Sequence, residues 1–349
     1  MKKWKEWHKK VWKTGCLIMA FVLLPVYVIS WITFKTAILR DNHSAFLENR
    51  WIKSLIAKAD GAIKAIKNNR IGGEPEKPRG KGFVDFPQEM ELGKQWFFTQ
   101  DRERITITSY DGLKLVAYYL PAEVESDRVF ILMHGYRNDG FNDFSGLVKY
   151  YHELGYHLLV PHQRSHGESE GKYICYGVKE RYDVKQWAEY VEKRFHGNCR
   201  IFLSGISMGA STVLMAASLS LPKQVKGVIA DCGFTSPWDI ISHVMRKECH
   251  IPGFPFLYIT DFICRNKAGF RLKECDTVSC MKKDRIPVLF VHGGKDLFVP
   301  VEMSCKSYEA CAAPKRILIV DDAAHGASHL LEPKLYRKTV EKFLNDCLG

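Results

Sequence analysis

The sequence predicts an α/β protein with a mostly parallel central sheet, preceded by a membrane-spanning segment. Two observations lead to this prediction. Short, continuously apolar runs alternate with helical segments from about residue 100 onward, a pattern typical of strands that helices cover on both faces. Near the amino terminus, Thr14–Phe34 is a run of 21 residues without a charge.

Length and composition are typical of one large globular domain with an appendage. The chain has 349 residues, of which 46% are hydrophobic and 26% charged, and its net charge is +12. Residues 1–82 hold 17 Lys and Arg against 6 Asp and Glu, which leaves 34 against 33 for residues 83–349. Because the basic character belongs to the amino-terminal segment, it does not indicate a nucleic-acid partner for the large domain.

The charge-free run predicts an uncleaved signal anchor over 14–34. At about 1.5 Å per residue it spans about 31 Å, enough to cross a bilayer. A cleaved signal peptide is the alternative, but its apolar core is usually about 7–15 residues and no small-x-small site follows here. The positive-inside rule places a basic tail, 1–13, in the cytoplasm and the rest of the chain across the membrane. The tail's lysines are Lys2, Lys3, Lys5, Lys9, Lys10 and Lys13.

Residues 35–82 connect the anchor to the large domain, 83–349. Apolar residues recur at helical spacing from Phe46 to Ile66 with lysines between them, which predicts an amphipathic helix packed on the domain or on an anionic membrane surface. The glycine- and proline-containing stretch 71–80 predicts a linker.

The large domain begins with a predicted hairpin, 105–108 and 113–119, joined around Asp111-Gly112. Buried strands are expected at 129–133, 158–160, 201–203, 228–230, 288–291 and 317–320, and helices at 143–154, 178–195, 208–220, 302–312 and 333–346. In a parallel α/β sheet the reactive groups gather at the carboxyl ends of the strands, so we look for them directly after these strands.

A G-x-S-x-G motif follows the strand predicted at 201–203. It reads Gly205-Ile206-Ser207-Met208-Gly209 and precedes a helical stretch. This strand–turn–helix context is that of a nucleophile elbow, in which glycines permit a tight turn that presents a serine hydroxyl. The alternative is a serine that caps the start of a helix.

A serine nucleophile needs a base and an orienting carboxylate, in the chain order serine, acid, histidine. Asp296 follows the strand predicted at 288–291, and His325 follows the one at 317–320. We assign His325 as general base and acid and Asp296 as the group that orients it. Asp231, after the strand at 228–230, is the alternative acid. His292 and His329 are interpreted as hydrogen-bonded or exposed histidines.

An oxyanion also needs hydrogen-bond donors. The backbone N–H of Met208, at the start of a helix, is one candidate, and that of Tyr136, after the strand at 129–133, is the other. Since both donors are main-chain groups, the two side chains are not expected to be essential. No Cys/His spacing typical of zinc occurs, so we expect neither a metal nor a cofactor.

Together these motifs resemble the α/β-hydrolase superfamily over about residues 100–347, most closely its bacterial, often membrane-anchored, esterase-like and serine-aminopeptidase-like branch. The resemblance implies an α/β-hydrolase fold and cofactor-free Ser-His-Asp hydrolysis, with Tyr136 and Met208 at the usual oxyanion positions. One segment departs from the pattern. Where relatives often have Asp-x-Arg-Gly-x-Gly-x-Ser, this chain has His162-Gln163-Arg164-Ser165-His166-Gly167-Glu168-Ser169. Whether His162 or His166 contacts substrate stays open.

The connection 235–286 is far longer than the usual loop of about 4–6 residues, which favours a lid. Its aromatic residues either line an apolar substrate pocket or pack beneath the lid. They are Trp238, Phe254, Phe256, Tyr258 and Phe262. The same connection contains the best disulfide candidates, Cys249, Cys264, Cys275 and Cys280.

The sequence therefore predicts a membrane-anchored serine hydrolase that cleaves carboxylic esters. The alternative within the enzyme class is an aminopeptidase-like or other amide hydrolase acting on short peptide-like substrates. The alternative of another class is a catalytically silent binding protein that keeps the fold. The physiological substrate and the oligomeric state are not predicted.

Overall fold

The computed structural model describes residues 4, 23–40 and 80–349. Most of the predicted cytoplasmic tail, residues 14–22 of the predicted anchor, the predicted amphipathic helix and most of the linker lie outside these residues. Among the helices of the described ranges, none is both long and apolar enough to cross a membrane.

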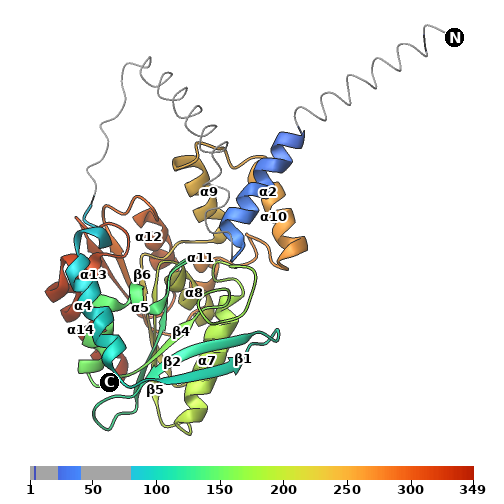
Figure 1. Cartoon of the computed structure of the whole chain (residues 1–349). Helices are drawn as coiled ribbons and strands as arrows, with labels where there is room; N and C mark the ends of the chain where they lie inside the picture. The colour runs from blue at the N-terminus through green and yellow to red at the C-terminus, as the bar shows by residue number, and fades with distance from the viewer. Residues whose placement is uncertain (1–3, 5–22, 41–79) are drawn as a thin grey trace.

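The core is an eight-stranded sheet in the order β1-β2-β4-β3-β5-β6-β7-β8 (Figure 1). The predicted hairpin is confirmed as antiparallel β1 and β2, and β2 is also antiparallel to β4, while β3 to β8 are mutually parallel. The strands are β1 (Glu103–Thr108), β2 (Lys114–Leu120), β3 (Arg128–Met133), β4 (His157–His162), β5 (Arg200–Ile206), β6 (Val225–Asp231), β7 (Val288–Gly293) and β8 (Lys315–Val320).

Helices cover both faces of the sheet and create two apolar cores. One core contains buried side chains of α7 and α8, and the other contains those of α4, α6 and α14. This arrangement explains the continuously apolar strands, because β3 to β7 face a core on both sides. The helices around the sheet are α4 (Pro87–Thr99), α5 (Gly140–Asp143), α6 (Ser145–Glu153), α7 (Glu180–Arg194), α8 (Met208–Ala217), α12 (Val301–Ala310), α13 (Ser328–Leu331) and α14 (Pro333–Leu348).

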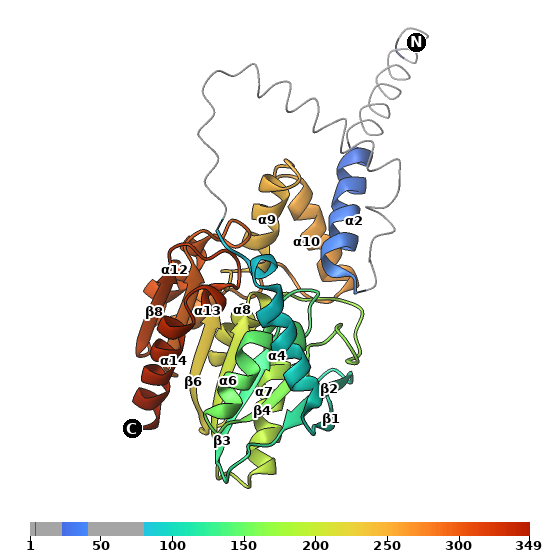
Figure 2. The ribbon, with the colours of Figure 1, turned by 60° about the vertical axis from the view of Figure 1, so that its left-hand side comes forward.

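The predicted lid connection contains three helices: α9 (Pro237–Lys247), α10 (Phe256–Lys267) and α11 (Thr277–Met281). Ser236 begins α9 by accepting a hydrogen bond from the Asp239 N–H, and Asp276 caps α11 in the same way. In two views α9 and α10 form an antiparallel pair that projects beyond the sheet (Figures 1 and 2).

Helix α2 (Leu24–Ile38) covers the second half of the predicted anchor and continues beyond it. It runs alongside α10 in both views (Figures 1 and 2). Ser30, Phe34 and Ile38, four residues apart, are buried, and the Ser30 carbonyl accepts a hydrogen bond from Thr260 Oγ1 at 3.2 Å. The carboxyl-terminal half of α2 therefore packs on protein. Its exposed large side chains are Leu23, Leu24, Tyr27 and Val28, near its amino-terminal end.

Candidate active site

Ser207 lies in the sharp turn between β5 and α8, with φ 58° and ψ −116°. A non-glycine residue in this region is strained, as in a nucleophile elbow. The two glycines of the motif are required by close packing. A Cβ on Gly205 would lie 2.3 Å from the Gly209 carbonyl, and a Cβ on Gly209 would lie 1.8 Å from the Met133 oxygen. The turn thus holds Ser207 at the carboxyl edge of the sheet.

The structure brings Ser207, His325 and Asp296 into one hydrogen-bonded relay. Ser207 Oγ lies 2.9 Å from His325 Nε2, and His325 Nδ1 lies 2.6 Å from Asp296 Oδ2. Ser207 and Asp296 are buried, and 24% of the His325 side chain is exposed. These distances allow a proton to pass from the hydroxyl to the imidazole.

Asp296 is held as a carboxylate by several donors. The backbone N–H groups of Phe298 and Val299 donate to Oδ1, at 3.0 and 2.9 Å. His292 Nε2 lies 3.2 Å from Oδ2, the oxygen that also faces His325. Burial acts to raise the pKa of Asp296, but the charge of His325 and hydrogen bonds from both histidines outweigh it and lower that pKa.

The pKa of His325 is shifted in the opposite direction. Burial on its own would lower it, but attraction to Asp296 and the hydrogen bond to that carboxylate dominate, with further contributions from Asp143 and Asp231. The net effect raises the pKa of His325 above its usual value. Asp296 therefore favours the charged form of His325, as a histidine that accepts a proton from a serine requires.

The alternative acid, Asp231, ends β6 and is 1% exposed, but it does not hydrogen-bond to His325. Neither of its side-chain oxygens has a hydrogen-bond partner within the described ranges. Burial raises the pKa of Asp231 to about 6. Its main chain supports the elbow instead, because the Ser207 N–H donates to the Asp231 carbonyl at 2.8 Å.

Tyr136 and Met208, the predicted oxyanion donors, flank Ser207 from two elements. Met208 is the first residue of α8, where helix N–H groups are unpaired and the dipole favours negative charge. The loop after β3 approaches the serine closely, since a Cβ on Gly135 would lie 3.3 Å from Ser207 Cβ. Buried Asp143 of α5 holds this loop by accepting from the Gly135 N–H and the Asn138 amide.

His162 and His166 are structural. The His166 ring is buried and accepts the Arg137 N–H at its Nε2, at 3.0 Å, while burial lowers its pKa to about 4. His162 is also buried and accepts the Glu168 N–H at Nδ1, at 3.1 Å. Both side chains hold residues 162–169, the segment that differs from the common family pattern, in place.

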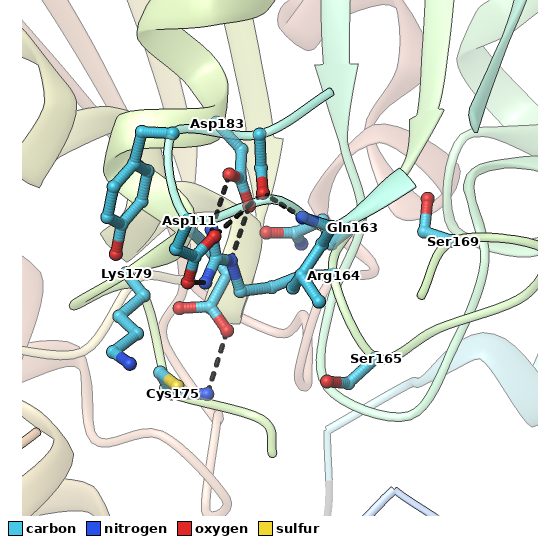
Figure 3. Close-up of polar contacts among 12 residues, drawn as sticks. Asp111, Gln163, Arg164, Ser165, Ser169, Cys175, Lys179 and Asp183 are labelled. Carbon is cyan, nitrogen blue, oxygen red and sulfur yellow. Dashed lines mark hydrogen bonds and ion pairs between the residues drawn. The ribbon is translucent and has the colours of Figure 1, made fainter. Parts of the chain in front are cut away.

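Arg164 gives residues 162–169 a structural role, because it joins them to two other parts of the fold. Its guanidinium, 2% exposed, lies between Asp183 of α7 and Asp111 of the β1–β2 turn, as Figure 3 shows. Its Nε and Nη2 donate to the two Asp183 oxygens at 2.6 and 2.7 Å, and it forms a second bidentate pair with Asp111. Removing either carboxylate would leave a buried charge partly unpaired.

Several other residues at the site carry roles that the motifs did not predict. His292 is buried, its Nδ1 lies 2.7 Å from Ser304 Oγ, and its Nε2 lies 2.9 Å from the Val299 carbonyl and 3.2 Å from Asp296 Oδ2. Asp143 comes from a short helix with no sequence signature. The Phe298 ring, half-exposed, packs edge-on against His325 with the ring centroids 5.1 Å apart. His329 is buried between the rings of Phe83 and Tyr336 and lies outside the relay.

Two of the lid aromatics pack beneath the lid, which is one of the two predicted roles, and the other three are exposed. Trp238 and Phe256 are partly buried against the core that lies beneath the lid. Phe254, just before α10, and Tyr258 and Phe262, within it, are exposed. The four candidate disulfide cysteines are free thiols, with Cys275 Sγ and Cys280 Sγ 3.4 Å apart.

One group of side chains has the composition of a metal site. Cys232, Asp296 and His325 offer ligand atoms within 4.8 Å of one another. Two of these residues already form the relay, and Cys232 Sγ lies 3.9 Å from His325 Nε2. The group therefore coincides with the candidate active site and does not form a second one.

The chain is similar in sequence and in fold to several known proteins. A model of the serine aminopeptidase family S33 matches residues 124–278. Protein YqkD of Bacillus subtilis is 29% identical over 253 residues, 72% of this chain and 81% of that protein.

Among solved structures, the esterase Pf2001 of Pyrococcus furiosus superposes with a TM-score of 0.60 at 20% identity, covering 80% of this chain and 97% of that one. An acylaminoacyl peptidase of Pyrococcus horikoshii superposes with a TM-score of 0.52 at 18% identity, covering 72% of this chain and 42% of that one. The predicted α/β-hydrolase fold is confirmed, because these solved structures share the fold of this chain.

Proposed function

We propose that the protein is a membrane-anchored serine hydrolase that cleaves carboxylic esters through an acyl-enzyme. The observation that carries this proposal is the relay from Ser207 Oγ through His325 to Asp296, with distances of 2.9 and 2.6 Å. The strained backbone at Ser207 supports the same conclusion, because it directs the hydroxyl toward His325 at the start of a helix.

The mechanism follows from the positions of these groups. Ser207 Oγ attacks the acyl carbonyl while His325 Nε2 takes its proton. The oxyanion that forms would accept hydrogen bonds from the backbone N–H groups of Tyr136 and Met208. His325 then gives the proton to the departing alcohol, and a water molecule, activated by the same imidazole, releases the acid. Asp296 keeps the imidazole oriented throughout.

The surroundings of His325 favour an ester with an apolar group. Leu297 and Phe298, 54% and 44% exposed, lie directly after Asp296, and the Phe298 ring contacts the imidazole. An apolar rim of this kind suits an acyl chain or an aryl group. An amide substrate is the second candidate, favoured by the match to the serine aminopeptidase model over 124–278.

The anchor is part of the proposal. The charge-free segment that begins at Thr14 would span the membrane with the amino terminus in the cytoplasm and the hydrolase domain on the other side, while its last turn, from Ser30 onward, packs on that domain. The charge-free run and the preceding lysines support this, as do the exposed apolar residues at the amino-terminal end of α2. Protease added to intact cells should then degrade the hydrolase domain, and protection until the cells are permeabilised would contradict this orientation.

A fluorophosphonate probe tests the reaction class in the full-length protein. We expect covalent labelling of Ser207 and hydrolysis of chromogenic esters. Ser207→Ala should abolish labelling and lower turnover by roughly 10⁴-fold or more. Ser218→Ala, at the other end of α8, is the matched control and should behave like the wild type.

Two outcomes would change the conclusion. A folded wild-type protein that is not labelled would favour the silent binding protein. Faster hydrolysis of aminoacyl anilides than of the matching esters would replace the ester assignment by the amide one.

A further inference from the structure

The last turn of α2 is bound to the same loop that carries Tyr136. The Arg137 guanidinium donates from Nη2 to the carbonyls of Thr36 and Leu39, at 3.0 and 2.6 Å, and from Nη1 to that of Arg40, at 3.0 Å. The Tyr136 hydroxyl lies 2.9 Å from the Ala37 carbonyl and accepts from Arg137 Nε at 2.7 Å. The last carbonyls of a helix have no partners within the helix and carry partial negative charge, so a guanidinium binds them well.

Independent contacts seat α2 against the domain. Ile38 is fully buried, and its carbonyl accepts the Ile174 N–H at 2.7 Å. The Phe34 ring, 2% exposed, packs against Tyr173 with centroids 6.1 Å apart. These contacts hold the end of α2 on the domain without any contribution from Tyr136 or Arg137. The end of α2 is therefore fixed against the loop that follows β3.

Other contacts hold the loop on both sides of the Tyr136 N–H. Asp143 holds Gly135, and His166 holds the Arg137 N–H, while Arg137 has a left-handed φ of 53°. Tyr136 stacks on Tyr176, with ring centroids 5.1 Å apart, and the Tyr176 hydroxyl is also 3.2 Å from the Ala37 carbonyl. The hydroxyl groups of Tyr136 and Tyr176 thus both face the carbonyl of Ala37 at the end of α2.

We propose that the carboxyl-terminal turn of α2 is a positioning element of the active site. Through the side chains of Tyr136 and Arg137 it holds the loop whose N–H binds the oxyanion, so full turnover requires α2 to be docked. The inference rests on the proposed hydrolase function and extends it. It also changes the expectation for Tyr136, whose side chain matters although its contribution to the reaction is a main-chain donor.

The expected consequence is a loss of kcat with little change in KM. A donor displaced by about 1 Å binds the substrate carbonyl almost as before but stabilises the developing oxyanion poorly. Complete loss of one such donor lowers kcat by about 10²–10³-fold. Because the loop keeps its bonds to Asp143 and His166, we expect Arg137→Met to lower kcat by about 10–100-fold and Tyr136→Phe to lower it less.

The experiment compares these variants as full-length proteins in nanodiscs. Initial rates on a chromogenic ester give kcat and KM separately. The inhibition constant of a trifluoromethyl ketone, whose adduct with a serine carries an oxyanion, should rise in proportion to the loss of kcat. Arg128→Met is the matched control, since Arg128 begins the same strand and also stacks on a tyrosine, Tyr156, but lies at the opposite end of β3.

A second pair of variants tests the helix instead of the loop. Ile38→Ser removes the buried contact that seats α2 but leaves every polar group of the loop intact. It should lower kcat and weaken ketone binding together. Val28→Ser, on the exposed side of the same helix, should do neither.

The proposal is overturned if Arg137→Met and Ile38→Ser are folded and keep wild-type kcat and ketone affinity. It is also overturned if they lower only the melting temperature, which would make α2 a stabilising element without influence on the loop. Failure of the hydrolase proposal would be distinct, since the wild-type protein itself would then neither hydrolyse esters nor react with a fluorophosphonate.

Discussion

The ends of β6 and β7 place two buried aspartates next to one histidine, yet the two carboxyl groups behave in opposite ways. Asp231 and Asp296 are 1% and 5% exposed, and both influence the pKa of His325. Burial raises the pKa of Asp231 to about 6, whereas that of Asp296 is lowered. Equal burial on adjacent strands therefore does not decide which group is ionised.

The difference lies in the hydrogen-bond donors that each strand end supplies. The chain after β7 turns back so that two backbone N–H groups and His292 face Asp296. The chain after β6 supplies no such donors to Asp231 within the described residues. A carboxylate that accepts several hydrogen bonds is stabilised in its charged form, and one that accepts none is destabilised. The acid of the relay is thus selected by the loop that follows its strand.

The largest effect expected from this comparison is on turnover. Asp296→Asn should lower kcat by about 10⁴-fold, because an amide does not hold the imidazole in the tautomer that accepts a proton from Ser207. Asp231→Asn should change kcat by less than about threefold, since Asp231 makes no hydrogen bond to the histidine. Ester hydrolysis by the two purified, folded variants measures this directly. Near-normal turnover of Asp296→Asn would move the acid to Asp231.

The sequence predicted that Asp296 lies near Ser207 and His325, but it did not predict why Asp296 and Asp231 differ. Each motif of the relay follows a strand directly, so strand order alone brings Ser207, Asp296 and His325 to one edge of the sheet. The donors to Asp296 and the isolation of Asp231 come from loop conformation and are not encoded in residue type. The docking of α2 was equally hidden. A charge-free apolar run has the same composition whether its residues face lipid or protein, and Arg137 binds backbone carbonyls that every sequence possesses.

Helix α4 was missed for a related reason. Its 13 residues include one buried side chain, Phe97, so the apolar periodicity that identifies a helix is nearly absent. The lid was predicted as an insertion, but the direction in which Phe254, Tyr258 and Phe262 face depends on packing between α9, α10 and α2.

A smaller effect is expected on stability. The pKa of Asp231 is about 6 in the folded protein against 3.8 for a free side chain, so the folded state binds this proton more tightly than the unfolded state. Its contribution is fully present below pH 3.8 and is lost as the pH rises through about 6. The loss amounts to about 3 kcal/mol.

Melting temperatures of the wild type and Asp231→Asn at several values between pH 4 and 7 test this. Over that interval the wild type should lose stability relative to the variant. Asp101→Asn, an exposed aspartate, controls for the loss of one charge. Parallel curves for the wild type and Asp231→Asn would mean that the carboxyl group of Asp231 finds donors after all, and the contrast with Asp296 would fail.

The smallest effect is on the acid limb of the pH–rate profile. His325 accepts a proton only when neutral, so kcat/KM should rise with pH through its pKa, which is raised above 6.5 mainly by Asp296 against the opposing effect of burial. Asp231 adds to that increase and is itself charged only above about pH 6. Asp231→Asn should therefore move the limb to lower pH, whereas Asp101→Asn should leave it in place. If the acid limb stays in place in Asp231→Asn, the prediction is wrong. Asp231 would then be protonated, and so uncharged, over the pH range in which the enzyme works.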